Sequence, residues 1–184
     1  MSGYIKIPDC HRDMKEVIYI DKEFEEIYEC DTNEELHPKP RGVIAACGTQ
    51  ARNIDFGIEE IELPVEIARV TIDTSCLCNP LVVIDFCSIV TLNFDVQAAT
   101  FVLSLSKECE GISKHTIDTF EFRRDDTDTS DSFCFDFCDF NNSCTGCCSY
   151  IVEITFASVT RGDAGLATIG QGVITANAQG ACSD

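Results

Sequence analysis

Apolar and polar residues alternate along most of the chain from residue 42 onward. In LVVIDFCSIVTLNF, residues 81–94, the even-numbered positions are apolar except for Ser88, while Asp85 and Thr91 belong to the opposite face. A period of two residues is that of a β-strand with one buried face. The same alternation occurs in three further stretches, at residues 68–72, 101–105 and 120–122.

Turn-forming Gly, Pro, Asn and Asp residues separate these stretches at intervals of about ten residues. Short strands at this spacing, with no alternation of strands and helices, are typical of an antiparallel β-sandwich or barrel. The sequence therefore predicts an all-β domain over residues 42–184.

The preceding residues follow a different pattern and form a predicted N-terminal arm. Acidic residues crowd its second half, and it closes with HPKPRG, whose two prolines mark a boundary. Four apolar residues recur at helical spacing, namely Val17, Ile20, Phe24 and Ile27. A short helix and a solvated acidic tail both remain open, and EVIYI is also suited to pair as a strand. The predicted division is an arm over residues 1–41 and a cysteine-rich domain over residues 42–184.

The stretch SFCFDFCDFNNSCTGCC, residues 132–148, contains five cysteines. In its FCFDFC segment the three phenylalanines share one face of a strand, while Cys134, Asp136 and Cys138 share the other. We expect the phenylalanines to fill the core and the two thiols to point outward or toward a neighbouring sheet. The last three cysteines fall in the loop that we expect to follow.

Charge and cysteine content restrict the class of protein. The chain of 184 residues contains 32 acidic and 13 basic residues, for a formal net charge of -19. Such a surface repels nucleic acid and anionic lipid, so we expect neither nucleic acid nor a membrane as a partner. Thirteen cysteines are typical of an oxidising compartment, although the opening MSGYIKIPDCHRDMKEV has no signal-peptide pattern. An odd number leaves at least one thiol free or paired with another chain.

A zinc site is the most specific alternative to disulfides, and it would place the protein inside the cell. Cys144 and Cys147 form a CxxC half-site, and Cys76 with Cys78 offers two further thiolates. A CxC on a strand is not the usual second half, however, and four ligands leave most of the cysteines unexplained. We therefore expect no metal and no other cofactor.

The sequence does not favour catalysis. A cysteine nucleophile needs a histidine base, and the histidines are His11, His37 and His115. Two of them lie in the predicted arm, and SKHTIDTF is typical of a solvated loop or strand end. The acidic run 123–132 lacks the glycine and the closing glutamate of a calcium loop, and the RGD tripeptide at 161–163 fits a hairpin turn. We expect no enzymatic activity.

Four segments carry a resemblance to a known family: PVEIARVTIDTSCLCNPLVVIDFCSIV at 64–90, FCFDFC, CTGCCSYIVEI and GVITANAQ. Over roughly residues 42–180 they resemble a cysteine-rich family of spore-forming Firmicutes, domain of unknown function 4489, and TSCLCNP is the most specific part. This family is similar in character to the subunits of endospore appendages.

The resemblance implies a jelly-roll sandwich that polymerises by pairing of sheet edges and through an N-terminal arm that forms disulfides with adjacent subunits. It also implies synthesis in the mother cell without a signal peptide and a final location outside the cell, on the spore surface. Appendage subunits have a short connector, whereas about forty residues precede the domain here.

Physical reasoning also favours a filament. Edge strands of an open sandwich can pair with another chain, and an odd number of thiols with a thiol-bearing arm offers a covalent link. We therefore predict a structural subunit that assembles with copies of itself into a helical filament, with other spore-surface proteins as further partners. The alternatives are a cytoplasmic zinc-binding domain and an amorphous spore-coat protein.

The cysteines divide into two predicted groups. Cys10 is the leading candidate for a link to a neighbour, because about thirty residues of arm at ~3.3 Å per residue span well beyond one subunit. The candidates for disulfides between chains, expected in the arm, in loops or in the tail, are Cys10, Cys30, Cys109, Cys147, Cys148 and Cys182. The candidates for disulfides within the chain, which strand parity favours, are Cys76, Cys78, Cys134 and Cys138.

Overall fold

A computed structural model describes most of the predicted domain. The described residues are 42–49, 52–57, 61–75, 77, 79–125, 128–140 and 146–180. All regular elements among them are strands, and the predicted arm lies outside them. The strands are β1 (Gly42–Cys47), β2 (Ile54–Phe56), β3 (Val65–Asp73), β4 (Leu81–Leu92), β5 (Val96–Cys109), β6 (Ile112–Arg124), β7 (Thr129–Asp139), β8 (Cys147–Arg161) and β9 (Ala167–Gly180).

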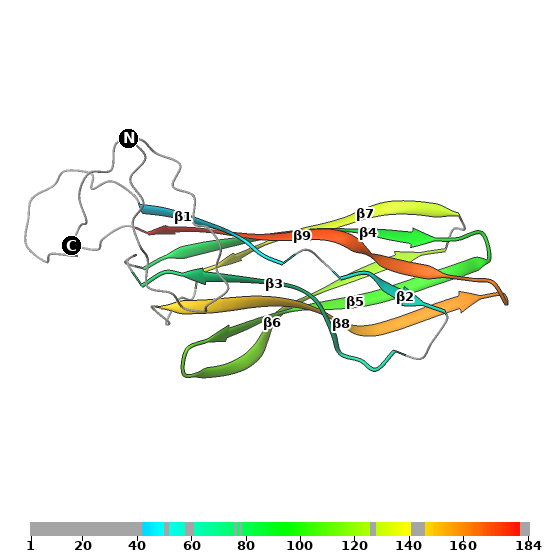
Figure 1. The fold of residues 1–184 in the computed structure, drawn as a ribbon, viewed down its shortest axis with the longest axis horizontal. Helices are drawn as coiled ribbons and strands as arrows, with labels where there is room; N and C mark the ends of the chain where they lie inside the picture. Colours follow the sequence, from blue (N-terminus) through cyan, green and yellow to red (C-terminus); the bar gives the residue numbers. More distant parts are fainter. Residues whose placement is uncertain are drawn as a thin grey trace, which may run out of the picture.

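These strands form two antiparallel sheets, and they run along the long axis of the molecule (Figure 1). One sheet has the order β1-β9-β4-β7, with β2 also pairing with β9, and the other has the order β3-β8-β5-β6. Most consecutive strands lie in opposite sheets, so the chain crosses the sandwich repeatedly, as in the double Greek key of a jelly roll. The predicted antiparallel jelly-roll sandwich is confirmed.

Alternate residues of both sheets fill the core between them. In β4 the even-numbered apolar residues are at most 1% exposed, which confirms the alternation seen in the sequence; they are Val82, Ile84, Phe86, Val90 and Leu92. From the other sheet, β5 contributes Phe101, Leu103 and Leu105, all equally buried. Burial of one such side chain stabilises the fold by about 1.5–3 kcal/mol, so the two inner faces hold the sheets together.

Phenylalanines join the two sheets on the side where β6 and β7 lie. Phe120 of β6 stacks on Phe135 of β7, with ring centroids 3.7 Å apart. Phe122 meets Phe133 edge to face at 5.8 Å. The predicted position of the FCFDFC phenylalanines on the core side of their strand is confirmed, since Phe135 is buried and its two neighbours pack against the same core.

Ser88 is the polar exception on the inner face of β4, and the structure explains why it is tolerated. Its hydroxyl is buried and donates a hydrogen bond to the carbonyl oxygen of Gly170 at 2.8 Å. The register between β4 and β9 shifts at this point, between Cys87 and Ile89. The serine thus occupies an irregular site in the ladder. Its buried hydroxyl is satisfied by the Gly170 carbonyl oxygen, to which an apolar side chain could not donate.

Gly48 lies where the chain leaves β1 and crosses toward the other sheet. Its N–H donates to the carbonyl oxygen of Ile174 in β9 at 2.9 Å, and the next N–H, of Thr49, donates to the carbonyl oxygen of Arg69 in β3 at 2.8 Å. A Cβ atom on Gly48 would collide with that Arg69 oxygen and with the Ile174 side chain. Only glycine lets the backbone pass this closely between two strands.

The turn around the RGD tripeptide differs from the expected hairpin. Arg161 ends β8, and the next strand, β9, lies in the opposite sheet. Asp95 holds the turn, because its carbonyl oxygen accepts from the N–H of Gly162 at 2.9 Å and its carboxylate accepts from the N–H of Ala164 at 2.7 Å. The hairpin prediction is wrong because a turn sequence does not reveal which sheet the following strand joins.

Candidate assembly surface

Each sheet of the sandwich ends in edge strands, and these edges differ in how far they are covered. The outer edge of β3 is partly occupied, because the N–H groups of Thr49 and Arg52 donate to the carbonyl oxygens of Arg69 and Ile67, both at 2.8 Å. Among the described residues, no strand pairs with the outer edges of β1 and β7. Unpaired N–H and C=O groups along an edge can template pairing with another chain.

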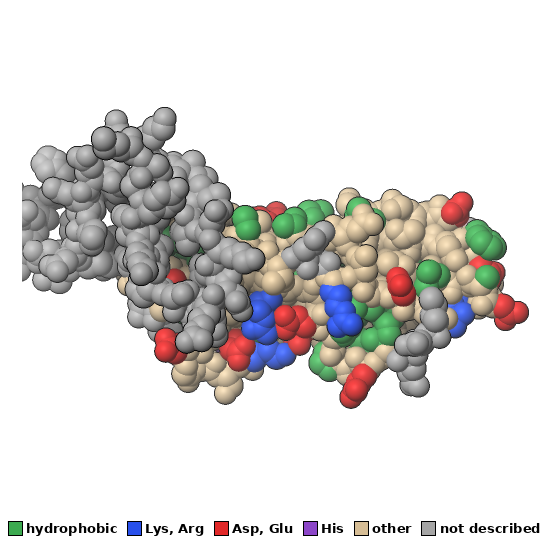
Figure 2. All heavy atoms as spheres, viewed as in Figure 1, with side chains coloured by type: hydrophobic (Ala, Val, Ile, Leu, Met, Phe, Trp, Pro, Cys, Tyr) green, Lys and Arg blue, Asp and Glu red, His purple; other side chains and the backbone are tan. Residues whose placement is uncertain are grey.

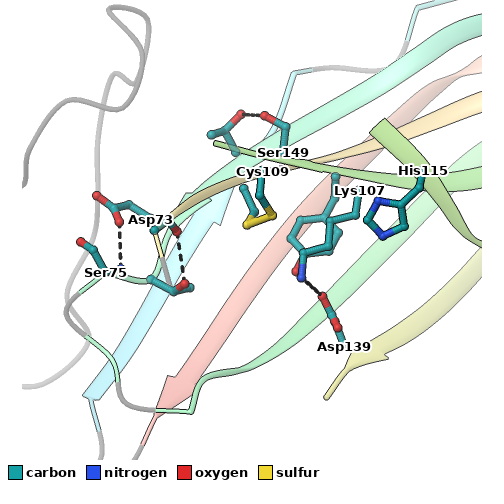
Figure 3. The surroundings of a disulfide bond; sticks show 12 residues. Asp73, Ser75, Lys107, Cys109, His115, Asp139 and Ser149 are labelled. Carbon is teal, nitrogen blue, oxygen red and sulfur yellow. Dashed lines mark hydrogen bonds and ion pairs between the residues drawn. A yellow bond between two sulfur atoms is a disulfide. The ribbon is translucent and has the colours of Figure 1, made fainter. Parts of the chain in front are cut away.

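A disulfide crosses a pair of neighbouring strands in each sheet. Cys87 of β4 is bonded to Cys134 of β7, and Cys109 of β5 is bonded to Cys148 of β8. In both bridges the two residues face each other directly in the ladder, with Cα atoms 4.1 Å apart. The first bridge lies on the exposed outer face of its sheet, whereas the second is buried on the inner face (Figure 3). Such bridges are typical of proteins in oxidising surroundings.

These bridges change the grouping of the cysteines. Cys109 and Cys148, expected in loops and as links between chains, are strand residues bonded to each other within the chain. The loop assignment is wrong because β5 continues to Cys109, beyond the alternation seen at residues 101–105, and because β8 already begins at Cys147. Cys134 forms a bridge within the chain, whereas Cys138, placed in the same predicted group, is free and exposed.

Cys147 is also disulfide-bonded and begins β8, so it is neither in a loop nor a zinc thiolate in this structure. The other half-site cysteines, Cys76, Cys78 and Cys144, lie outside the described residues. The same is true of the predicted link residues Cys10, Cys30 and Cys182.

Cys47 and Cys138 are the free cysteines of the described residues, and both are exposed. Cys47 ends β1 and Cys138 lies near the end of β7, so they occupy the two opposite edges of one sheet. Sequence reasoning did not single out Cys47. A signal was available in GVIAAC, where Ile44 and Ala46 alternate with Cys47, but the segment is too short to show which sheet edge it forms.

A buried charged group connects the two sheets near the buried disulfide (Figure 3). The Nζ of Lys107 in β5 donates to Oδ2 of Asp139 in β7 at 2.5 Å, and the two side chains are only 5% and 9% exposed. The hydroxyl of Tyr150, itself fully buried, donates to the same oxygen at 2.8 Å. The ammonium also lies over the Tyr150 ring, 5.7 Å from its centroid. Because this group ties β7 to β5 and β8, we assign it a structural role.

A second charged cluster lies on the outer surface of the β3-β8-β5-β6 sheet. Arg69 makes two hydrogen bonds to the Glu66 carboxylate, at 3.0 and 2.8 Å, and reaches Glu108 at 3.4 Å. The hydrogen bonds that Arg69 donates to the Glu66 carboxylate raise the pKa of the guanidinium, with partial burial acting in the opposite direction. On the face drawn in Figure 2, basic side chains lie close to acidic ones, and hydrophobic side chains are scattered.

The described residues contain no group of three or more His, Cys, Asp or Glu side chains placed to hold a metal ion. His115 lies near the start of β6, exposed, with its Nδ1 3.3 Å from the carbonyl oxygen of Ser113. The other two histidines, His11 and His37, lie outside the described ranges. No helix in the described part of the chain is long and apolar enough to cross a membrane.

Comparison with known proteins gives one family and several distant structures. No curated protein matches the chain. "Structure of infectious bursal disease virus Gx strain" matches with 10% identity and a TM-score of 0.44, over 77% of this chain and 32% of that one. "Structure of infectious bursal disease virus Gt strain" matches with 13% identity and a TM-score of 0.38, over 82% and 42%. The chain thus spans less than half of either viral chain.

The family match agrees with the resemblance read from the sequence segments. It covers residues 42–179, from the first residue of β1 to within one residue of the end of β9. The chain belongs to the family described as Domain of unknown function (DUF4489).

Proposed function

We propose that this protein is a non-catalytic structural subunit that assembles with copies of itself into an extracellular, spore-associated filament. In this proposal residues 42–184 form the sandwich unit and residues 1–41 form an acidic arm that reaches a neighbouring subunit. Pairing of sheet edges and disulfides between chains hold the filament together. Other spore-surface proteins are its further partners.

The observation that carries the proposal is the pair of edges on the β1-β9-β4-β7 sheet. Among the described residues both edges are unpaired, and each has an exposed free thiol. An isolated soluble domain normally protects such edges with charge, proline or a covering segment, because they invite association. In its sequence TSDSFCFDFCD, β7 has no Lys, Arg or Pro, and its charged residues are Asp131, Asp136 and Asp139.

The disulfides within the sandwich support an extracellular location. Two cross-strand bridges are suited to an oxidising environment, and each stabilises a domain by about 2–4 kcal/mol. A fibre outside a cell is exposed to heat, drying and proteases. A covalent bridge between strands in each sheet protects the fold against them. The resemblance to endospore appendage subunits favours the spore as the place of assembly.

The arm supplies a second link between subunits in this proposal. Cys10 remains the leading candidate, with Cys30 as the alternative, because both precede the sandwich by a stretch of chain that can span to a neighbour. The domain cysteines expected to bond to the arm include Cys182. It remains a candidate, since Cys109, Cys147 and Cys148 already form disulfides.

Negative-stain electron microscopy of the purified full-length protein tests the proposal. After oxidation we expect filaments of constant diameter, whereas a zinc-binding domain would remain monomeric or dimeric and a coat protein would form amorphous material.

The Cys10→Ser variant tests the arm separately, by electrophoresis without reductant. Wild type should give a ladder or fail to enter the gel, and the variant should fall largely to monomer. A Cys10→Ser ladder identical to that of wild type contradicts the arm link.

A further inference from the structure

Cys47 and Cys138 lie on the same face of their sheet as well as on its opposite edges. In β7 the buried Phe135 and Asp139 point inward, so Cys138, with the exposed Cys134, belongs to the outer face. In β1 the buried Ile44 and Ala46 point inward, so Cys47 belongs to the outer face too. A second copy placed beside the first, with its sheet continuing the first, would therefore bring both thiols to one side of the joined sheet.

Strand direction allows such a continuation. Each neighbouring pair in the β1-β9-β4-β7 sheet is antiparallel, so β1 and β7 run in opposite directions. When a copy is moved sideways without rotation, β7 of one copy meets β1 of the next as another antiparallel pair. The sheet then continues from copy to copy without a change in its pattern.

The register of the sheet shows how far the copies must slip for the thiols to meet. One row of partners across the sheet is Ala45, Asn177, Val83 and Cys138. The row two residues along is Cys47, Thr175, Asp85 and Asp136. Cys138 thus meets Cys47 of the next copy after a slip of two residues, about 7 Å. An even slip keeps every side chain on its own face.

The backbone groups of both cysteines also point toward the free edges. Antiparallel pairs alternate between a hydrogen-bonded and a closer, non-hydrogen-bonded type. The Cα separation of 4.1 Å marks Cys87 and Cys134 as the closer type, and Cys138, four residues along β7, repeats it. On the other edge the N–H of Gly48 bonds to β9 at Ile174, so the groups of the preceding Cys47 face away from β9. The two cysteines can therefore form a hydrogen-bonded pair across the junction.

We propose that the end of β7 of one chain pairs with the end of β1 of the next, with Asp139 opposite Ala46, and that a Cys138–Cys47 disulfide locks this short junction. The inference rests on the proposed self-assembly and names its contact surface. A hydrogen-bonded antiparallel pair has Cα atoms about 5.5 Å apart, within the usual range for a disulfide. In the reaction two thiols join, and a small-molecule disulfide accepts their two electrons and two protons to become two thiols.

The same pair of residues cannot bond within one chain. Three inter-strand spacings of about 4.8 Å separate β1 from β7, or about 14 Å, whereas Cα atoms of bonded cysteines lie within about 7 Å. β9 and β4 lie between them in the sheet. Any disulfide between Cys47 and Cys138 therefore reports contact between two chains.

Peptide mapping of the full-length protein tests the junction. The protein is oxidised in a glutathione buffer, its remaining thiols are alkylated, and it is digested without reduction. Trypsin releases Cys47 in GVIAACGTQAR, and chymotrypsin, which cuts after Phe137 and Phe140, isolates Cys138 from the neighbouring cysteines. We expect a disulfide-linked pair of these peptides. Recovery of both cysteines alkylated, or bonded elsewhere, would overturn the proposal.

Two single variants and their mixture test the head-to-tail geometry. Cys47→Ser and Cys138→Ser should each lose the linked peptide pair, because each lacks one of the two thiols. Mixing them before oxidation should restore it, because the first variant supplies Cys138 and the second supplies Cys47. Absence of the bond from the mixture would count against the junction, and the double variant is the matched negative control.

Microscopy of the same samples separates this inference from the proposed function. Wild-type filaments that lack the Cys47–Cys138 bond would overturn the junction and leave the filament standing. The bond in samples that contain only short, irregular oligomers would support the junction and contradict the filament.

Discussion

Lys107 and Asp139 place opposite charges inside the sandwich, where each compensates the other. Both are nine-tenths buried or more, and Tyr150 donates to the same carboxylate oxygen. Lys107→Met leaves a buried carboxylate without this counter-charge, so we expect the free energy of unfolding to fall by about 3–5 kcal/mol. Adding Asp139→Asn removes the charge but keeps an acceptor for Tyr150, so the double variant should be more stable than Lys107→Met alone. Denaturant unfolding with the disulfides intact measures both.

The matched control is an exposed ion pair of the same chain. Arg123 lies 3.6 Å from Asp125, and both side chains are 67% exposed. Arg123→Met should therefore change the free energy of unfolding by less than about 1 kcal/mol, since water solvates the remaining carboxylate. A double variant at the buried pair that is no more stable than Lys107→Met would show that charge burial is not what makes this site sensitive.

At the scale of elements, alternation of apolar residues predicted β3, β4, β5 and β7 well because each has one face in the core. The pattern could not reveal that β5 extends to Cys109 or that β8 begins at Cys147, since a cysteine fits a strand and a loop equally well. Nor could it reveal Lys107, a charged residue on an otherwise apolar face, because its partner Asp139 comes from the opposite sheet. Pairings of this kind depend on which strands become neighbours, and that is decided by the whole fold.

Mild reductant should reduce the two described disulfides at different rates, because one lies on the outer face of its sheet and the other on the inner face. Cys87 and Cys134 are exposed, whereas Cys109 and Cys148 are 6% and 3% exposed. A reductant reaches the first bridge in the native state but reaches the second only when the sandwich opens. Differential alkylation followed by mass spectrometry should therefore find Cys87 and Cys134 labelled first. In denaturant the order should disappear, and earlier labelling of Cys109 and Cys148 under native conditions would contradict the structure.

At the scale of the whole molecule, the shape and the charge act in opposite directions on assembly. The open edges of β1 and β7 favour pairing between chains, and hydrogen bonds along an edge are short-range. The formal net charge of -19 makes two copies repel each other over a longer distance. Approach of the copies is therefore the step that the charge opposes, and ionic strength should control it.

We expect oxidised full-length protein to assemble faster as sodium chloride is raised from about 0.01 M to about 0.15 M, because the Debye length falls from about 30 Å to about 8 Å. Light scattering follows the rate, and sucrose at equal osmolality is the control for effects unrelated to charge. Replacing Asp136 by Asn, on the outer face of β7, removes one negative charge beside the proposed junction without touching the core. This variant should assemble faster than wild type at low salt and nearly equally at high salt, since screening makes the missing charge irrelevant. Assembly that slows as salt is added would mean that attraction between opposite charges, rather than edge pairing against a net repulsion, brings the chains together.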